Sequence, residues 1–136
     1  MRSIVSFIAV FGLSAALIAC ATKVPMQSSQ MAPAAQGTVK VKKGESGNTW
    51  ITLKVEHLAP AARLTPPKSH YVVWADSGSG GRLVLLGLLK PNEDLEAELE
   101  GPVPFTNFRV IVTGEDQLAP SYPSDATVLV TEYVGS

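Results

Sequence analysis

The chain has 136 residues, of which 46% are hydrophobic and 17% charged, with a formal net charge of -1 and one cysteine. This length allows one domain of ordinary size. A single cysteine excludes an internal disulfide framework and any multi-cysteine zinc or iron–sulfur site. The near-neutral charge argues against nucleic acid as a partner, because phosphate binding needs a surplus of Lys and Arg.

The first 19 residues have the pattern of a signal peptide. Met1 and Arg2 form a positive start, and an apolar run extends from Ile4 to Ala19. The run is shorter than the roughly 20 residues that a membrane-spanning helix needs, and it fits a signal peptide better. A short membrane anchor, or an ordinary secretory peptide followed by an incidental cysteine, is the alternative interpretation.

The run ends in Leu17-Ile18-Ala19-Cys20. This tetrapeptide resembles the lipobox of bacterial lipoproteins, with a Leu three residues before the cysteine and a small residue directly before it. The resemblance implies that signal peptidase II cuts before Cys20, that the thiol carries a diacylglycerol and that the amine is usually acylated, for example by palmitate. Ala21, where inner-membrane lipoproteins tend to have Asp, implies the outer membrane, facing the periplasm, if the host has two membranes.

Residues 20–36 are predicted to be the lipidated cysteine and a flexible tether. The segment from Ala21 to Gln36 is rich in Ala, Gln, Ser and Pro and shows no period. A flexible chain of this length reaches on the order of 20–25 Å. The folded domain is therefore expected to start at Gly37 and to lie near the membrane surface.

From Gly37 to the C-terminus the pattern predicts strands separated by turns and no long helix. The predicted strands are Thr38–Lys42, Thr49–Glu56, His70–Asp76, Arg82–Leu89, Leu95–Glu100, Phe108–Thr113 and Thr127–Val134. About seven short strands over residues 37–136 indicate an all-β, immunoglobulin-like β-sandwich. A short helix over residues 92–99 is the alternative for the fifth strand, because that stretch contains good helix formers.

Three strands have features of their own. His70–Asp76 is apolar on both faces, which is typical of a central strand, and its Trp74 is expected to pack between the two sheets. Gly87 predicts a bulge or a close backbone approach. In the fifth strand, three alternating glutamates (Glu96, Glu98 and Glu100) are expected to face water and to protect a sheet edge.

No residue pattern indicates a catalytic or metal site. His57 and His70 flank the proline-rich connection, but their spacing matches no metal-ligand motif. The sequence contains no Ser, His and Asp grouping and no phosphate-binding loop that opens a helix. We therefore predict no catalytic residues, no metal, no cofactor and no enzyme activity.

Lys40, Lys42 and Lys43 cluster near the first hairpin, where they are placed to face anionic headgroups beside the anchor. Trp50 falls on the outward side of its strand, where it is suited to hold a partner or to cover a sheet edge. These four residues are the predicted partner surface. Residues 20–70 are net basic and residues 71–136 are net acidic. In a sandwich, strands from the two halves of the sequence lie next to one another, so this difference in charge need not separate the charges in space.

Tyr71-Val72-Val73-Trp74-Ala75, Leu86-Gly87-Leu88-Leu89 and the stretch from Phe105 to Val112 resemble the extracytoplasmic domain of anti-sigma-K factors. The resemblance implies a sandwich fold. We find neither the sigma-binding segment nor the membrane-spanning helix of that family, so no functional residue is expected to carry over.

The leading hypothesis is a membrane-anchored envelope lipoprotein whose non-catalytic domain is a binding or structural accessory module for an envelope protein. An accessory sensor for a transmembrane regulator of the anti-sigma type is the second hypothesis. The third is an enzyme or a carbohydrate-binding module, which requires a concave site lined by aromatic side chains or converging carboxylates. An exposed groove shared by Trp50 and Tyr122 or Tyr133 would favour it.

Overall fold

The computed structural model describes residues 21–78 and 80–135 and shows an all-β protein. The strands are β1 (Thr22–Ser28), β2 (Gln36–Lys43), β3 (Thr49–Glu56), β4 (His70–Asp76), β5 (Leu83–Leu89), β6 (Ala97–Val103), β7 (Asn107–Glu115), β8 (Thr127–Thr131) and β9 (Val134–Gly135). Two short 3-10 turns, η1 (Glu45–Gly47) and η2 (Ala61–Arg63), lie between strands. The all-β fold class is confirmed. The predicted signal peptide (1–19) and Cys20 lie outside the described residues.

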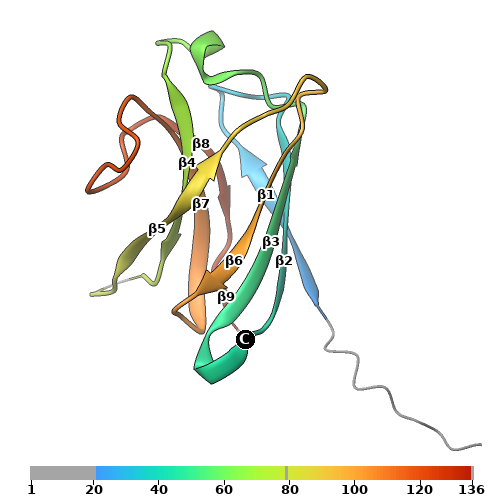
Figure 1. The fold of residues 1–136 in the computed structure, drawn as a ribbon, viewed down its shortest axis with the longest axis vertical. Helices are drawn as coiled ribbons and strands as arrows, with labels where there is room; N and C mark the ends of the chain where they lie inside the picture. The colour runs from blue at the N-terminus through green and yellow to red at the C-terminus, as the bar shows by residue number, and fades with distance from the viewer. Residues whose placement is uncertain (1–20, 79, 136) are drawn as a thin grey trace, which may run out of the picture.

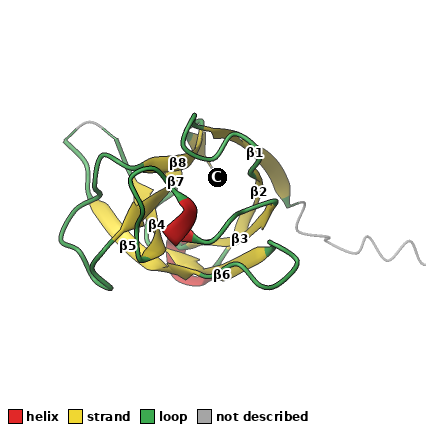
Figure 2. Cartoon of the chain, turned by 90° about the horizontal axis from the view of Figure 1, so that it is seen from above, coloured by secondary structure: helices red, strands yellow, loops and turns green. Residues whose placement is uncertain are grey.

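All strand pairs are antiparallel, in the order β5-β4-β7-β8-β1-β2-β3-β6, and β9 adds to β7. The strands curl into a nearly closed ring around one core (Figures 1 and 2). The first and last strands of this order, β5 and β6, meet through side chains: a Cβ on Gly87 would lie 3.2 Å from Leu99 Cδ1. The close contact at Gly87 is therefore with a side chain and not with the backbone.

The core consists of the inward residues of facing strands, as the alternating pattern predicts. They include Val39, Val41, Ile51, Leu53 and Val55 on one side and Tyr71, Val73, Ala75, Val110, Val112 and Val128 on the other. Each aliphatic side chain buried in this way contributes about 1.5–3 kcal/mol relative to exposure. Alternate residues on β2 and β3 point outward, which leaves one polar face on that side of the molecule.

The prediction of a flexible tether is wrong, because residues 22–28 form β1 in the middle of the sheet order (Figure 1). The first four residues of β1 pair with β2 and the last three with β8. Pro25 is the last residue before this change of partner. A proline has no N–H to offer a ladder, so it is tolerated where the strand leaves one neighbour for the next. The folded domain begins at Thr22 rather than Gly37.

β6 confirms a strand rather than a helix for the glutamate segment. Residues 92–96 form a turn: the Asn92 side-chain oxygen accepts from the backbone N–H groups of Asp94 and Glu96, and Leu95 has a φ of 62°, which a helix does not adopt. The strand then starts at Ala97, two residues later than expected. The predicted bulge is also found: Val73 pairs with Gly87 and Trp74 with Leu85, so Leu86 is the extra residue.

Trp74 is buried, but its expected position between the sheets is wrong. It packs with Val72 and Ile111 in a second cluster, separate from the main core, and its indole N–H donates to Thr113 Oγ1 at 2.9 Å. The neighbours Tyr71, Val73 and Ala75 belong to the main core. Strand alternation therefore places Trp74 on the outer face of β4.

The connectivity differs in one respect from that of an immunoglobulin domain. There, the second and third consecutive strands lie in different sheets. Here β2 and β3 are hydrogen-bonded neighbours in a hairpin. The predicted strand from Thr127 to Val134 is divided into β8, which pairs with β7 along Ile111–Thr113, and the short β9, which pairs with the start of β7.

Candidate functional site

The two ends of the sheet carry different loops. At the near end, where β1 begins, lie the β2–β3, β4–β5 and β6–β7 turns and β9 (Figure 1). At the far end lie the β1–β2, β3–β4, β5–β6 and β7–β8 connections. The predicted partner residues all lie in the near half.

The outer face of β1 and β2 brings lysines together. Lys23 of β1 is directly opposite Lys40 of β2, and Lys42 follows two residues along the same face. Residues directly opposite in an antiparallel pair lie about 4.5–5.5 Å apart between Cα atoms, so Lys23 and Lys40 repel each other. Among the residues that the structure describes, none of these lysines has an acidic partner within ion-pair distance.

Trp50 lies beside these lysines. It is half-buried on the outer face of β3, paired with Lys42 on one side and Pro102 on the other. An open groove of about 600 Å³ surrounds it. The groove is lined by Lys42, Lys43, Gly44, Glu45, Asn48, Trp50 and Pro102. The predicted residues Lys42, Lys43 and Trp50 are thus in one groove, and Lys40 lies next to it.

The start of β3 is held firmly. Thr49 is fully buried, and its hydroxyl donates to the Phe105 carbonyl at 2.7 Å, which ties the β2–β3 hairpin to the β6–β7 turn. Within the hairpin, Gly44 N–H donates to Asn48 O at 2.8 Å, and a Cβ on Gly44 would lie 3.0 Å from that oxygen. The glycine therefore permits the tight turn that sets Lys43 beside Trp50.

We call Lys23, Lys40, Lys42, Lys43 and Trp50 the basic corner. Sequence reasoning missed Lys23, because it lies in the segment interpreted as a tether. The alternation of Val24 and Met26 with Lys23, Pro25 and Gln27 was the available signal. Pro25 within so short a run weakens a strand prediction, which explains the omission.

A second charged group at the near end is already paired. Arg109 Nε donates to Asp76 Oδ2 at 2.9 Å, and the Arg109 guanidinium lies 5.3 Å from the centre of the Tyr133 ring. Burial alone would raise the pKa of Asp76, but hydrogen bonds from Gly78 N–H, Arg109 and Tyr133 and the charge of Arg109 lower it overall. These contacts join β4, β7 and the C-terminal segment.

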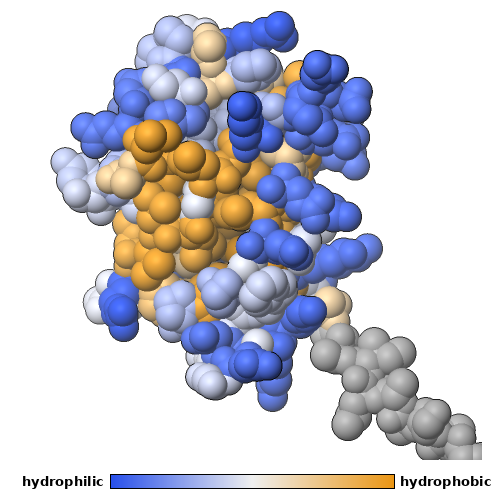
Figure 3. All heavy atoms as spheres, viewed as in Figure 1, coloured by the Kyte–Doolittle hydropathy of each residue, from blue (hydrophilic) through white to orange (hydrophobic). Residues whose placement is uncertain are grey.

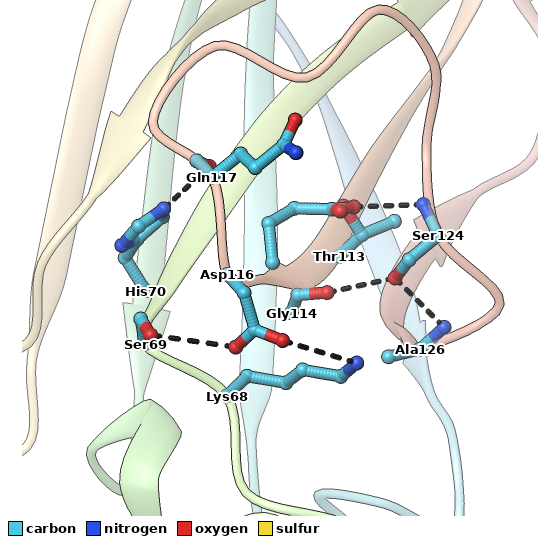
Figure 4. Close-up of polar contacts among 10 residues, drawn as sticks. Lys68, Ser69, His70, Thr113, Gly114, Asp116, Gln117, Ser124 and Ala126 are labelled. Carbon is cyan, nitrogen blue, oxygen red and sulfur yellow. Dashed lines mark hydrogen bonds and ion pairs between the residues drawn. The ribbon is translucent and has the colours of Figure 1, made fainter.

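At the far end, Glu115 is the centre of a buried polar network, whose partners Thr113 and Ser124 are labelled in Figure 4. Its Oε2 accepts from Thr113 Oγ1 at 2.6 Å and from Ser124 N–H at 2.8 Å. The Ser124 hydroxyl donates to Gly114 O at 2.7 Å and accepts from Ala126 N–H at 3.1 Å. The network fixes the β7–β8 loop against the sheet.

Ser69, His70 and Asp116 are neighbours in the same region (Figure 4). The Ser69 hydroxyl donates to Asp116 Oδ1 at 3.3 Å, and His70 Nε2–H donates to the Gln117 carbonyl. In a nucleophilic triad, the imidazole must instead accept the proton of the serine hydroxyl. Here both side chains hold the β7–β8 loop.

The surface over β5 is apolar (Figure 3). Leu83 and Leu88 are 39% and 43% exposed, and a small cavity of about 120 Å³ opens between β5 and β6. Its lining residues are Ile51, Leu86, Leu99, Glu100, Gly101 and Pro102. This face closes the sheet through side chains rather than a hydrogen-bonded ladder.

Several further findings bear on function. Tyr122 and Tyr133 do not line the groove around Trp50, so this groove offers a sugar ring one aromatic face. Within residues 21–78 and 80–135, no group of three or more His, Cys, Asp or Glu side chains converges as metal ligands require. Over the same residues we find no helix with the length and apolar character needed to cross a membrane. The sequence matches no protein-family model and no curated protein.

Proposed function

We propose that the protein is an envelope lipoprotein, anchored through Cys20, whose β domain is a binding or structural accessory module held directly at the membrane surface. The observation that carries this proposal is the position of β1. Its first residue, Thr22, is only two residues after the cysteine of the lipobox-like sequence. Two extended residues span at most about 7 Å, so a lipid on Cys20 would hold the near end of the sheet at the headgroups.

The basic corner supports a binding role. Its lysines gather in one half of the sheet and repel each other across β1 and β2. Such an arrangement costs stability in the isolated domain, and an acidic partner surface would offset that cost. A glycan-binding role has less support, since Trp50 lacks a second aromatic ring in its groove.

The experiment is replacement of the predicted lipid-bearing residue in cells. Cys20→Ser should move the protein from the membrane fraction to the soluble fraction and abolish labelling by a palmitate analogue, because the thiol is the attachment point of the diacylglycerol. Ser14→Ala, within the apolar run, is the matched control and should leave both readouts unchanged. Full membrane association of the Cys20→Ser protein would contradict the proposal. If the anchoring is established, crosslinking of the wild-type protein in intact cells would identify the partner of the domain.

A further inference from the structure

The charged residues divide along the long axis of the sheet, and cross-strand register shows the division. The near half carries Lys23, Lys40, Lys42, Lys43, Arg82 and Arg109 with Glu45, Asp76, Glu100 and Glu132. The far half carries Lys54, Arg63, Lys68 and Lys90 with Glu56, Glu93, Asp94, Glu96, Glu98, Glu115, Asp116 and Asp125. The near half is therefore net positive and the far half net negative.

The basic charge of the near half is concentrated beside the start of the chain's folded part. Lys23 is one residue into β1, Lys40 is opposite it, and Lys42 follows Val41, which pairs with Thr22. The register therefore places these lysines on the residues next to the first pair of the sheet. Three acidic side chains face these lysines. Glu45 shares the groove of Lys42 and Lys43, Glu56 lines a second pocket with Lys23 and Lys40, and Glu100 ends the row of Lys23 and Lys40 on β6.

We propose that the basic corner docks on anionic phospholipid headgroups and so orients the domain, with its near end on the membrane and its far end away from it. This inference rests on the proposed anchoring at Cys20. Clusters of four or more Lys and Arg next to a membrane attachment favour anionic lipid. The net negative far half is repelled by the same surface, so one orientation of the anchored domain is preferred.

Trp50 fits this position. Tryptophan prefers the membrane–water interface, where its ring meets apolar chains and its N–H remains near polar groups. Trp50 is half-buried on the outer face between Lys42 and Pro102. The other tryptophan, Trp74, is buried and donates to Thr113. The two indoles therefore provide one probe for the lipid surface and one internal reference.

The test uses the mature protein as cells process it, purified in detergent and mixed with vesicles that have brominated acyl chains. One set contains one part phosphatidylglycerol to two parts phosphatidylcholine, and the other contains phosphatidylcholine alone. Quenching of tryptophan emission reports contact with lipid, and the Trp50→Phe protein gives the contribution of Trp74. We expect quenching of Trp50 in the anionic vesicles and little in the neutral ones, with loss of the difference near 1 M salt, where the Debye length is about 3 Å.

Charge variants provide the matched comparison. Lys42→Gln with Lys43→Gln should lower the ratio of docked to undocked protein by roughly 25-fold, at about fivefold for each lysine. Lys54→Gln with Lys90→Gln changes the net charge equally in the far half and should leave the ratio unchanged. Equal quenching in both vesicle types, or equal effects of the two double variants, would overturn the docking inference.

Sedimentation separates this inference from the proposed function. Protein that sediments with vesicles but shows no quenching of Trp50 would overturn the docking and leave the anchoring intact. Protein that remains in solution would overturn the anchoring and, with it, the orientation that depends on it.

Discussion

The two ends of the sheet use their polar side chains in different ways. At the far end, Glu115, Ser124 and their neighbours hydrogen-bond to one another and hold a long loop. At the near end Arg109 pairs with Asp76, but Lys23 and Lys40 lie side by side with no acidic partner within ion-pair distance among the described residues. Polar groups that are satisfied internally stabilise the fold, whereas like charges held together favour an external partner. The proposed binding role of the near end rests on this difference.

The same contrast is found on the outer face of the sheet, between two rows of side chains that lie opposite one another on neighbouring strands. In the near row, Lys40 is opposite Lys23 on β1 and Thr52 on β3. In the far row, Lys54 is opposite Glu98 on β6. A lysine therefore repels its cross-strand neighbour in one row and attracts it in the next, over a separation of two residues along β3.

The largest expected effect tests whether β1 belongs to the sheet, since the basic corner depends on it. Met26 is buried in the core, so Met26→Ala should reduce the free energy of unfolding by about 3 kcal/mol through lost contacts and a cavity. Gln27→Ala, exposed on the same strand, should change it by less than about 0.5 kcal/mol. Urea unfolding measures both. If both substitutions changed the free energy of unfolding by the same small amount, residues 21–36 would be a flexible tether and not part of the sheet.

The far-end network should show the next largest effect. Glu115→Ala removes the acceptor of Thr113 and Ser124 and should lower the free energy of unfolding by about 2 kcal/mol. Asp125→Ala, exposed in the same loop, is the control and should be nearly neutral. Hydrogen exchange of the β7–β8 loop should rise only in the Glu115 variant. An unchanged loop would mean that the network does not hold it.

The lysine rows predict effects of opposite sign. Lys40→Gln relieves the repulsion with Lys23 and should raise the free energy of unfolding by about 0.5 kcal/mol. Lys54→Gln removes an attraction to Glu98 and should lower it by a similar amount. Chemical denaturation at low salt measures the pair, and high salt should reduce both differences. If both variants changed the free energy of unfolding in the same direction, the proposed contrast between the two rows would be wrong.

The smallest effect concerns pH at the near end. Because contacts with Arg109, Gly78 and Tyr133 lower the folded-state pKa of Asp76, the ionised carboxylate stabilises the fold above the ordinary carboxyl pKa. This stabilisation is lost as the pH falls through the lowered pKa. Asp76→Asn should cost at most about 0.5 kcal/mol at neutral pH, since the pair is partly exposed, and nothing in strong acid. A cost that does not depend on pH would show that packing, not charge, holds this site.

Local pattern was sufficient for most of the fold. Alternation along β2, β3 and β6 predicted strands with one wet face, and the apolar run of β4 predicted a central strand. The same alternation placed Lys40, Lys42 and Trp50 on outward positions, where the structure has them. These features depend only on the two-residue period of a strand, which is contained in a few neighbouring residues.

The sequence by itself determined most of the strands and the exposed glutamates of β6, and the lipobox-like residues before Cys20 predict a lipid anchor. Only the tertiary structure decided that residues 22–28 belong to the sheet, that Trp74 faces outward, that Lys23 joins Lys40, and that charge divides between two ends. The reason is physical. The period of a strand is local, whereas its partner and register depend on residues distant in sequence, so which charges become neighbours is decided when the strands pair.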